Sequence, residues 1–250
     1  MQQPPDSPAV MALHQPFIKL RRARTHIEEL EALFLTYLRE TPPRVSTKLV
    51  SSPDGGWEVE FNFSSDPVPD EAGAVFGDAI HNIRAALDLA ACECVRANGN
   101  SDKGVLFPFC EKAADLDKMI KDRKLLRASP AVVQYVQSLK PYAGGNAALR
   151  AIHDLDLRDK HRGMMPQPTS FASPAIEMLD KNGKPHAFPR IVGDPNTPAD
   201  VKIVFPSDTI FANDEIIPTL HKLVALADSI VAALASIIEG DALNATKRAP

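Results

Sequence analysis

One thirty-residue stretch constrains the fold of this chain more than any other. After Pro69, residues 70–98 carry apolar side chains at steps of three and four, with no further proline. Pro69 suits the first position of a helix, and the pair Asn98-Gly99 suits a left-handed C-cap. The apolar seam is spaced like a heptad, so this helix is predicted to lie against other helices over most of its length. The seam consists of Phe76, Ile80, Ile83, Leu87, Ala90 and Cys94.

The same periodicity predicts further helices along the chain. Caps support two of them, because Ser129 precedes Pro130 and Asn146 precedes a helix that we expect to end near Lys160 or Arg162. Proline residues end several of the runs. The predicted segments are residues 17–40, 113–126, 129–142, 146–162 and 213–239, the last of them apolar nearly all round.

Two stretches alternate apolar and polar residues around turn-forming sequences. They are residues 44–63, around PDGG, and residues 172–205, around DKNG, and both predict β-hairpins. The expected fold is therefore α+β: mainly a helical bundle of roughly five or six helices, with a small antiparallel sheet built from hairpins. Residues 17–239 are expected to form one domain, and residues 1–16 and 240–250 to be tails.

Composition narrows the class of protein. The 250 residues include 28 basic and 32 acidic side chains, a formal net charge of -4, which argues against a histone-like coating of nucleic acid. Three cysteines cannot build a disulfide framework and are expected in the core. Residues 1–16 lack a signal-peptide pattern, and charged residues and Pro218 interrupt the apolar last helix. We expect a cytoplasmic protein with no membrane anchor.

The stretch GDAIHNIRAALD, residues 77–88, carries the first group of candidate functional residues. At about 100° per residue, His81 and Asp88 fall on nearly one line, with Arg84 beside them at the edge of the apolar seam. One interpretation is an ordinary helix-surface ion pair between Arg84 and Asp88. The other is a desolvated polar cluster, which the small residues of the seam would allow by admitting another helix closely.

The second group lies in NAALRAIHDLDLRDKHR, residues 146–162. Helical geometry projects Asp156 and Asp159 onto the predicted buried side, with His153 and Lys160 at its margin. In the alternative interpretation, Lys160 and the two residues after it complement the negative end of the helix dipole. If the two helices lie side by side, His81 and Arg84 are expected to meet Asp156 or Asp159. Such a network would serve as a structural clamp, a metal site or an acid-base site.

We expect no metal and no cofactor. The Glu-x-x-His pair of carboxylate metal sites is absent, and Arg84 and Lys160 would repel a cation. A phosphate-binding glycine loop and a Gly-x-Ser-x-Gly elbow are also absent from the sequence. A basic group on the first helix, Lys19, Arg21, Arg22 and Arg24, is interpreted as a solvated face and as the only compact basic patch.

The sequence HNIRAALD followed by DKHR resembles a group of uncharacterised bacterial proteins with HNxRxxLD and DKHR motifs. The resemblance covers residues 77–162 and implies that the motif residues belong to one site. Together with Asp156, the candidate site residues are His81, Asn82, Arg84, Asp88, Asp159, Lys160, His161 and Arg162.

A weaker resemblance is to HEPN-type helical bundles, which are metal-independent ribonucleases of defence and toxin systems. Those proteins use an arginine, a polar neighbour and a histidine four to six residues later. This chain departs from that pattern, because Arg158 and His161 are too close, and the pair Arg21 and His26 lies on the first helix.

Two main functions therefore stand as hypotheses. The first is action on RNA or a related phosphodiester, with His81 or His161 moving protons and Arg84 or Arg162 stabilising phosphate charge. The second is a non-catalytic structural or interaction module that binds a protein partner or a second copy of itself. A metal-dependent hydrolase is a third.

Overall fold

A computed structural model describes residues 13–42, 44–51, 57–163, 166–170, 176–179, 185–191 and 201–248. The described part of the chain is α+β and mainly helical, as predicted. Its helices are α2 (His14–Glu40), α3 (Asp70–Ala97), α4 (Leu116–Asp122), α5 (Pro130–Ser138), α6 (Ala147–Arg162) and α7 (Ile216–Arg248), with short 3-10 turns η1 (Ala113–Asp115) and η2 (Leu125–Arg127). Its strands are β1 (Arg44–Ser51), β2 (Trp57–Ser64), β3 (Gln167–Ser170), β4 (Ile176–Leu179), β5 (Pro185–Ile191) and β6 (Val201–Val204).

The chain divides into two compact units. One, here called the helical unit, comprises Met1–Leu30, Gly73–Met164 and Ile217–Pro250. The other, the strand unit, comprises Glu31–Ala72 and Met165–Ile216.

The strand unit consists of antiparallel strand pairs. β1 pairs with β2 from Arg44 opposite Ser64 to Ser51 opposite Trp57, which confirms the first predicted hairpin. β4 pairs with β5, and β6 pairs with β3. The sequence did not indicate β3, because Pro168 lies in it; a two-stranded ladder has only edge strands, where proline is tolerated. The connecting turns at 52–56 and 180–184 lie outside the described residues.

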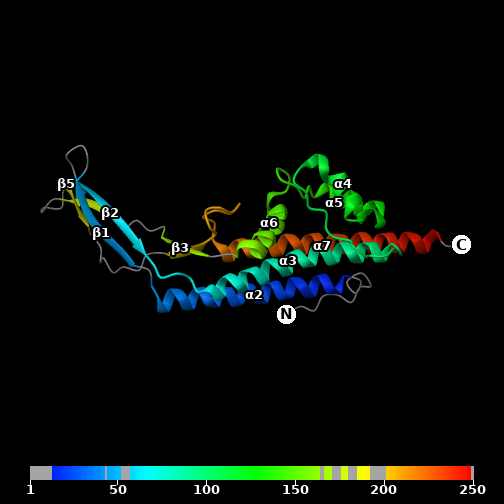
Figure 1. Cartoon of the computed structure of the whole chain (residues 1–250), viewed down its shortest axis with the longest axis horizontal. Coiled ribbons are helices and arrows are strands. Elements are labelled where there is room, and N and C mark those ends of the chain that lie inside the picture. The colour runs from blue at the N-terminus through cyan, green and yellow to red at the C-terminus, as the bar shows by residue number, and fades with distance from the viewer. Residues whose placement is uncertain are drawn as a thin grey trace. The chain divides into compact units, whose positions relative to one another are not determined.

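The helical unit is built around the predicted seam of α3. All six seam residues are buried, so the heptad-like prediction is confirmed. In Figure 1 the long helices α2, α3 and α7 run alongside one another, with α6 and the α4–α5 region beside them. An ion pair between Arg24 and Asp228 joins α2 to α7. Apolar side chains from α6, including Leu149, Ile152 and Leu155, are buried in the same unit.

Local sequence signals set the ends of two helices in this unit. The Ser129 hydroxyl accepts the Val132 N–H at the start of α5, and the Asn146 side chain accepts the Leu149 N–H at the start of α6. Gly163, with φ of 65°, ends α6 at the distal side of the predicted DKHR motif. Both predicted caps are confirmed.

The last helix is longer than predicted and reaches Arg248. Among the described helices α7 is the one long and apolar enough to cross a membrane by length and composition, with a mean hydropathy of 1.8 over its most apolar window. Of that window, 39% is buried inside the protein. A core helix of a soluble protein can have the same length and apolar composition.

Candidate functional site

A histidine and a carboxylate from the two motif helices meet in the helical unit. Nδ1 of His81, on α3, lies 3.0 Å from Oδ1 of Asp156, on α6. The Asp156 side chain is 9% exposed, whereas the His81 side chain is 53% exposed. A carboxylate accepts hydrogen bonds, so among the two neutral tautomers it favours the one with the proton on Nδ1 and a lone pair on Nε2. This contact holds the ring in one orientation beside solvent.

The second oxygen of Asp156 is also occupied. Nζ of Lys160, one helical turn further along α6, lies 2.6 Å from Oδ2 of Asp156. The buried carboxylate thus contacts a different partner with each oxygen, as a buried charge requires. Lys160 is half-exposed and keeps donors beyond the one that Asp156 uses.

Asp159 lies against the backbone of α3. A Cβ atom added to Gly77 would stand 2.6 Å from Cγ of Asp159, so a larger residue at position 77 would displace this carboxyl group. Burial raises the pKa of Asp159 above its ordinary value, and the charges of Asp156 and Asp78 raise it further. Asp159 is therefore a carboxyl group whose negative charge the surroundings disfavour. Together, His81, Asp156, Lys160 and Asp159 form what we call the His81 cluster.

Arg84 belongs to a separate group of contacts. Its Nη1 lies 2.5 Å from Oδ2 of Asp88, although without hydrogen-bonding angles, and its guanidinium carbon lies 4.5 Å from the centre of the Phe109 ring. The other oxygen of Asp88 accepts the Phe107 N–H at 2.8 Å. The Arg84 side chain is 11% exposed. This arginine is thus committed to a neighbouring carboxylate and an aromatic face.

The Phe109 ring also stacks on His153. The two ring centres are 5.0 Å apart and the planes differ by 8°. Burial lowers the pKa of His153, and the positive charges of Arg84 and Arg150 lower it further. Nδ1 of His153 is buried without a hydrogen-bond partner among the described residues. His153 is therefore held as a neutral ring in the core.

Arg150 attaches the loop that carries Phe109 to α6. It donates from Nε to Asp154 at 2.9 Å and from Nη1 to the Cys110 carbonyl at 2.5 Å, and it also pairs with Glu111. This role of Arg150 was not predicted from the sequence. At about 100° per residue Arg150 lies roughly 160° from Ile152 and roughly 140° from Leu155, away from the predicted apolar side, so the periodicity of α6 gave no signal for its burial.

The structure separates residues that the sequence analysis placed in one site. The expected contact of Arg84 with Asp156 or Asp159 is wrong, because Arg84 pairs with Asp88. The expected contact of His81 with Asp156 is confirmed. The i to i+4 ion pair that was the alternative interpretation does form, but it is largely buried rather than on the surface.

The remaining predicted residues lie apart from these contacts. The Asn82 side chain donates to the Asp78 carbonyl of its own helix, at 2.8 Å. His161 is exposed at the end of α6. The side chain of Arg162 lies outside the described residues. Among those residues no three His, Cys, Asp or Glu side chains are grouped as metal ligands.

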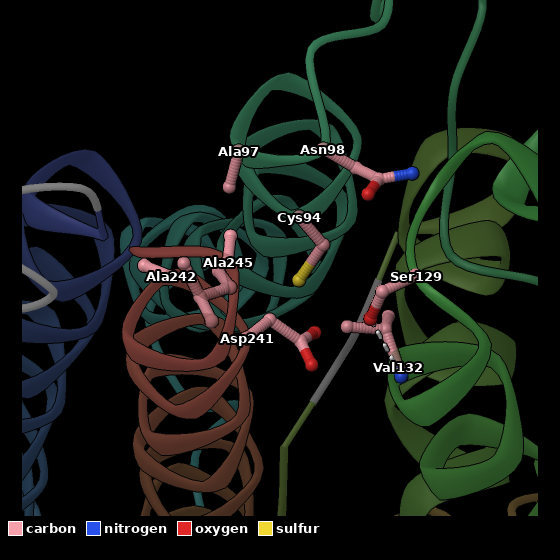
Figure 2. A pocket seen from close by; sticks show the side chains of 9 residues that line it. Cys94, Ala97, Asn98, Ser129, Val132, Asp241, Ala242 and Ala245 are labelled. Carbon is pink, nitrogen blue, oxygen red and sulfur yellow. Dashed lines mark hydrogen bonds between the residues drawn. The ribbon is translucent and has the colours of Figure 1, made fainter. Parts of the chain in front are cut away.

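A small cavity lies elsewhere in the helical unit. It has a volume of about 150 Å³ and lies between α3, α5 and α7 (Figure 2). Burial raises the pKa of Cys94, on its wall, to about 12, so this thiol stays protonated and is a poor nucleophile. Figure 2 shows Asp241 on the α7 side, facing Ser129 and Val132 of the α5 side. Cys94 follows His81 by thirteen residues on α3, roughly 20 Å along the helix axis, so the cavity is distinct from the His81 cluster.

Comparison of the chain with protein-family models, with curated proteins and with solved structures finds no match.

Proposed function

We propose that this protein cleaves RNA without a metal ion, with His81 as the general base. The observation that carries the proposal is the contact between Nδ1 of His81 and the buried Asp156, which leaves the Nε2 edge of a half-exposed ring for a substrate. A ring oriented by a carboxylate on one nitrogen is suited to take a proton at the other.

The neighbourhood of His81 favours RNA over other esters. α6 contains no Ser, Thr or Cys, and α3 contains none before Cys92, about three turns beyond His81. Neither helix thus places a hydroxyl or thiol beside His81, which favours a nucleophile that comes from the substrate or from water. RNA carries its own, the 2′ hydroxyl, next to each phosphate.

The proposed reaction balances without any further group. The 2′ oxygen loses its proton to Nε2 of His81 and bonds to phosphorus. The bond from phosphorus to the 5′ oxygen breaks, and the departing oxygen takes a proton from water. The hydroxide that remains takes the proton from Nε2 of His81, which restores the neutral ring and the water. The products are a 2′,3′-cyclic phosphate and a free 5′ hydroxyl. Lys160 is the cation of the His81 cluster and would stabilise the charge that develops on the phosphate oxygens.

The proposal gives Arg84 a different role from the one expected from sequence. Because Arg84 is buried, paired with Asp88 and covered by Phe109, it supports the loop at residues 107–111 rather than contacting a phosphate. Arg84 is thus a structural residue of the site.

A cleavage assay on single-stranded RNA tests the proposal. Wild-type protein should cleave a twelve-nucleotide RNA in EDTA, and should not cleave at a position that lacks its 2′ hydroxyl. His81→Gln should lower the rate by about 10² or more. His161→Gln is the matched control, a histidine exposed at the end of α6, and should stay within about twofold of wild type.

Two results would contradict the proposal. One is a folded wild-type protein that cuts no RNA, which would make the His81 cluster a contact between helices only. The other is cleavage that requires a divalent cation, which would favour a metal-dependent hydrolase.

A further inference from the structure

The helical unit carries a group of positive charges that the sequence analysis overlooked. It consists of five residues in the α4–η2 region and one in the preceding loop, and we call it the basic cluster. All but Lys124 are exposed. Its members are Lys103, Lys118, Lys121, Arg123, Lys124 and Arg127.

Among the described residues, these charges have no carboxylate partner in direct contact. Throughout the described part of the chain, no ion pair joins any member of the basic cluster to a carboxylate. Two acidic residues nearby have other partners. Asp102 forms an ion pair with Arg96, and Asp117 accepts a hydrogen bond from Gln137. On α2, by contrast, Arg24 is paired with Asp228. The expectation that residues 19–24 form the only compact basic patch is therefore wrong.

Hydrogen bonds to backbone carbonyls hold two members of the basic cluster, Lys124 and Arg127, in place. Nζ of Lys124 donates to the Lys103 carbonyl, and Nη1 of Arg127 donates to the Ser101 carbonyl, each at 3.0 Å. The carbonyl of Arg127 in turn accepts from Asn98 at 2.9 Å and from Asn100 at 2.8 Å, which fixes η2 to the end of α3. Carbonyl oxygens orient a cation without cancelling its charge. Lys124 and Arg127 are thus prearranged for an external anion.

We propose that the basic cluster binds the phosphate backbone of single-stranded RNA. Arg and Lys donors without counterions fit a row of phosphates, and binding releases the counterions of the nucleic acid. Leu126, 58% exposed among these cations, offers an apolar contact for a base. One exposed leucine is too little apolar surface for a helix that inserts into a membrane surface. This inference rests on the proposed function of His81 and assigns it a substrate-holding surface.

The distance along α3 sets the length of RNA that reaches both places. Asn98, which holds η2, follows His81 by seventeen residues, or roughly 25 Å at 1.5 Å per residue. A stacked strand advances about 3.4 Å per nucleotide, so roughly eight nucleotides span this length. A tetranucleotide can occupy the His81 cluster without touching the basic cluster, whereas a fifteen-nucleotide strand can contact both.

Binding of a fluorescein-labelled fifteen-nucleotide uridine RNA, followed by anisotropy between 50 and 300 mM KCl, tests the inference. All proteins carry His81→Gln so that the RNA is not cut. The variant Lys121→Gln/Arg123→Gln/Arg127→Gln should bind at least tenfold more weakly at 50 mM KCl. It should also lower the slope of log affinity against log salt by about 2, for three lost phosphate contacts. The matched control Lys19→Gln/Arg21→Gln/Lys222→Gln removes the same charge from the same unit and should bind within twofold of its parent.

The outcomes separate this inference from the proposed function. Equal binding by the cluster variant and its parent would overturn the inference, as would loss of binding in the control variant alone. The inference would also be overturned if the cluster variant lost binding to phosphatidylserine vesicles but bound RNA as its parent does. That result would assign the surface to membranes. If the cluster variant loses RNA binding but wild-type protein cuts no RNA, the inference stands and the proposed function fails. If wild-type protein cuts a tetranucleotide and the cluster variant binds long RNA normally, only the inference fails.

Discussion

His81 and Asp156 are 75 residues apart in the chain, yet Nδ1 of one lies 3.0 Å from Oδ1 of the other. This contact joins α3 to α6 and places an oriented imidazole at the protein surface. The same carboxylate pairs with Lys160. A residue that contacts two partners couples their energies, and the coupling can be measured.

The free energy of unfolding should show that coupling in a double-mutant cycle. His81→Gln, Asp156→Asn and the double variant, each measured by urea denaturation, should give an interaction energy of about 1 kcal/mol between the two positions. The reason is that Asp156→Asn removes the charge that His81 faces. Pairing His81→Gln with Asp154→Asn, a carboxylate that contacts Arg150 instead, should give additive effects. An additive cycle at Asp156 would contradict the contact.

Removal of the buried arginine should be costly. Arg84→Ala leaves the Asp88 carboxylate without its cation and a gap beside Phe109, so we expect a loss of about 3 kcal/mol in the free energy of unfolding. Arg96→Ala is the control, because Arg96 forms ion pairs on the exposed part of the same helix, and it should cost less than about 1 kcal/mol. Equal losses in the two variants would argue against the buried role of Arg84.

Stability should depend on pH through His153. Its pKa is lowered in the folded protein, so below its ordinary value of 6.5 the unfolded chain takes up a proton that the folded chain resists. The contribution of this ring to stability is therefore complete above pH 6.5 and falls as the pH drops towards the folded-state pKa. His153→Phe keeps a ring against Phe109 but cannot titrate. The urea midpoint should fall less between pH 7 and pH 5 in this variant than in wild type; parallel falls would contradict the prediction.

The close approach of α6 to α3 should depend on Gly77. Alanine there gains about 1 kcal/mol of helix propensity, but its Cβ collides with the Asp159 carboxyl group, at a cost of roughly 1–3 kcal/mol. Gly77→Ala should therefore be neutral to destabilising in wild type and stabilising in an Asp159→Ala background. Gly240→Ala is the control, since nothing lies within 4 Å of a Cβ at that helical position. Stabilisation by Gly77→Ala in wild type, equal to that at Gly240, would show that the helices do not meet there.

More of the fold than of the candidate site could be predicted from the sequence. Apolar periodicity identified the α3 seam, and Ser129 and Asn146 marked helix starts, because these signals act within one element. The sequence did not predict β3, because this strand contains Pro168. A strand tolerates proline at the edge of a sheet, and the edge position of β3 cannot be read from local sequence.

Helical geometry predicted that Asp156 would project inward but could not predict which residue of α3 it meets. That choice depends on how the two helices are rotated and spaced, and Gly77 sets the spacing by admitting the Asp159 carboxyl group. The contact of Arg84 with Phe109 and the burial of its ion pair with Asp88 were missed for a second reason. Phe107 and Phe109 come from a loop between the two motif helices, and no periodicity in either helix indicates a third element.

The most direct test of the proposed chemistry is the identity of the ends left on cleaved RNA. Mass spectrometry of a twelve-nucleotide RNA, incubated in EDTA with wild-type protein and with His81→Ala, reads both ends in one measurement. The proposal predicts 2′,3′-cyclic phosphate and 5′ hydroxyl ends with wild type, and their loss with His81→Ala unless imidazole is added. Fragments with 5′ phosphate ends, or the same products from His81→Ala at the wild-type rate, would contradict it.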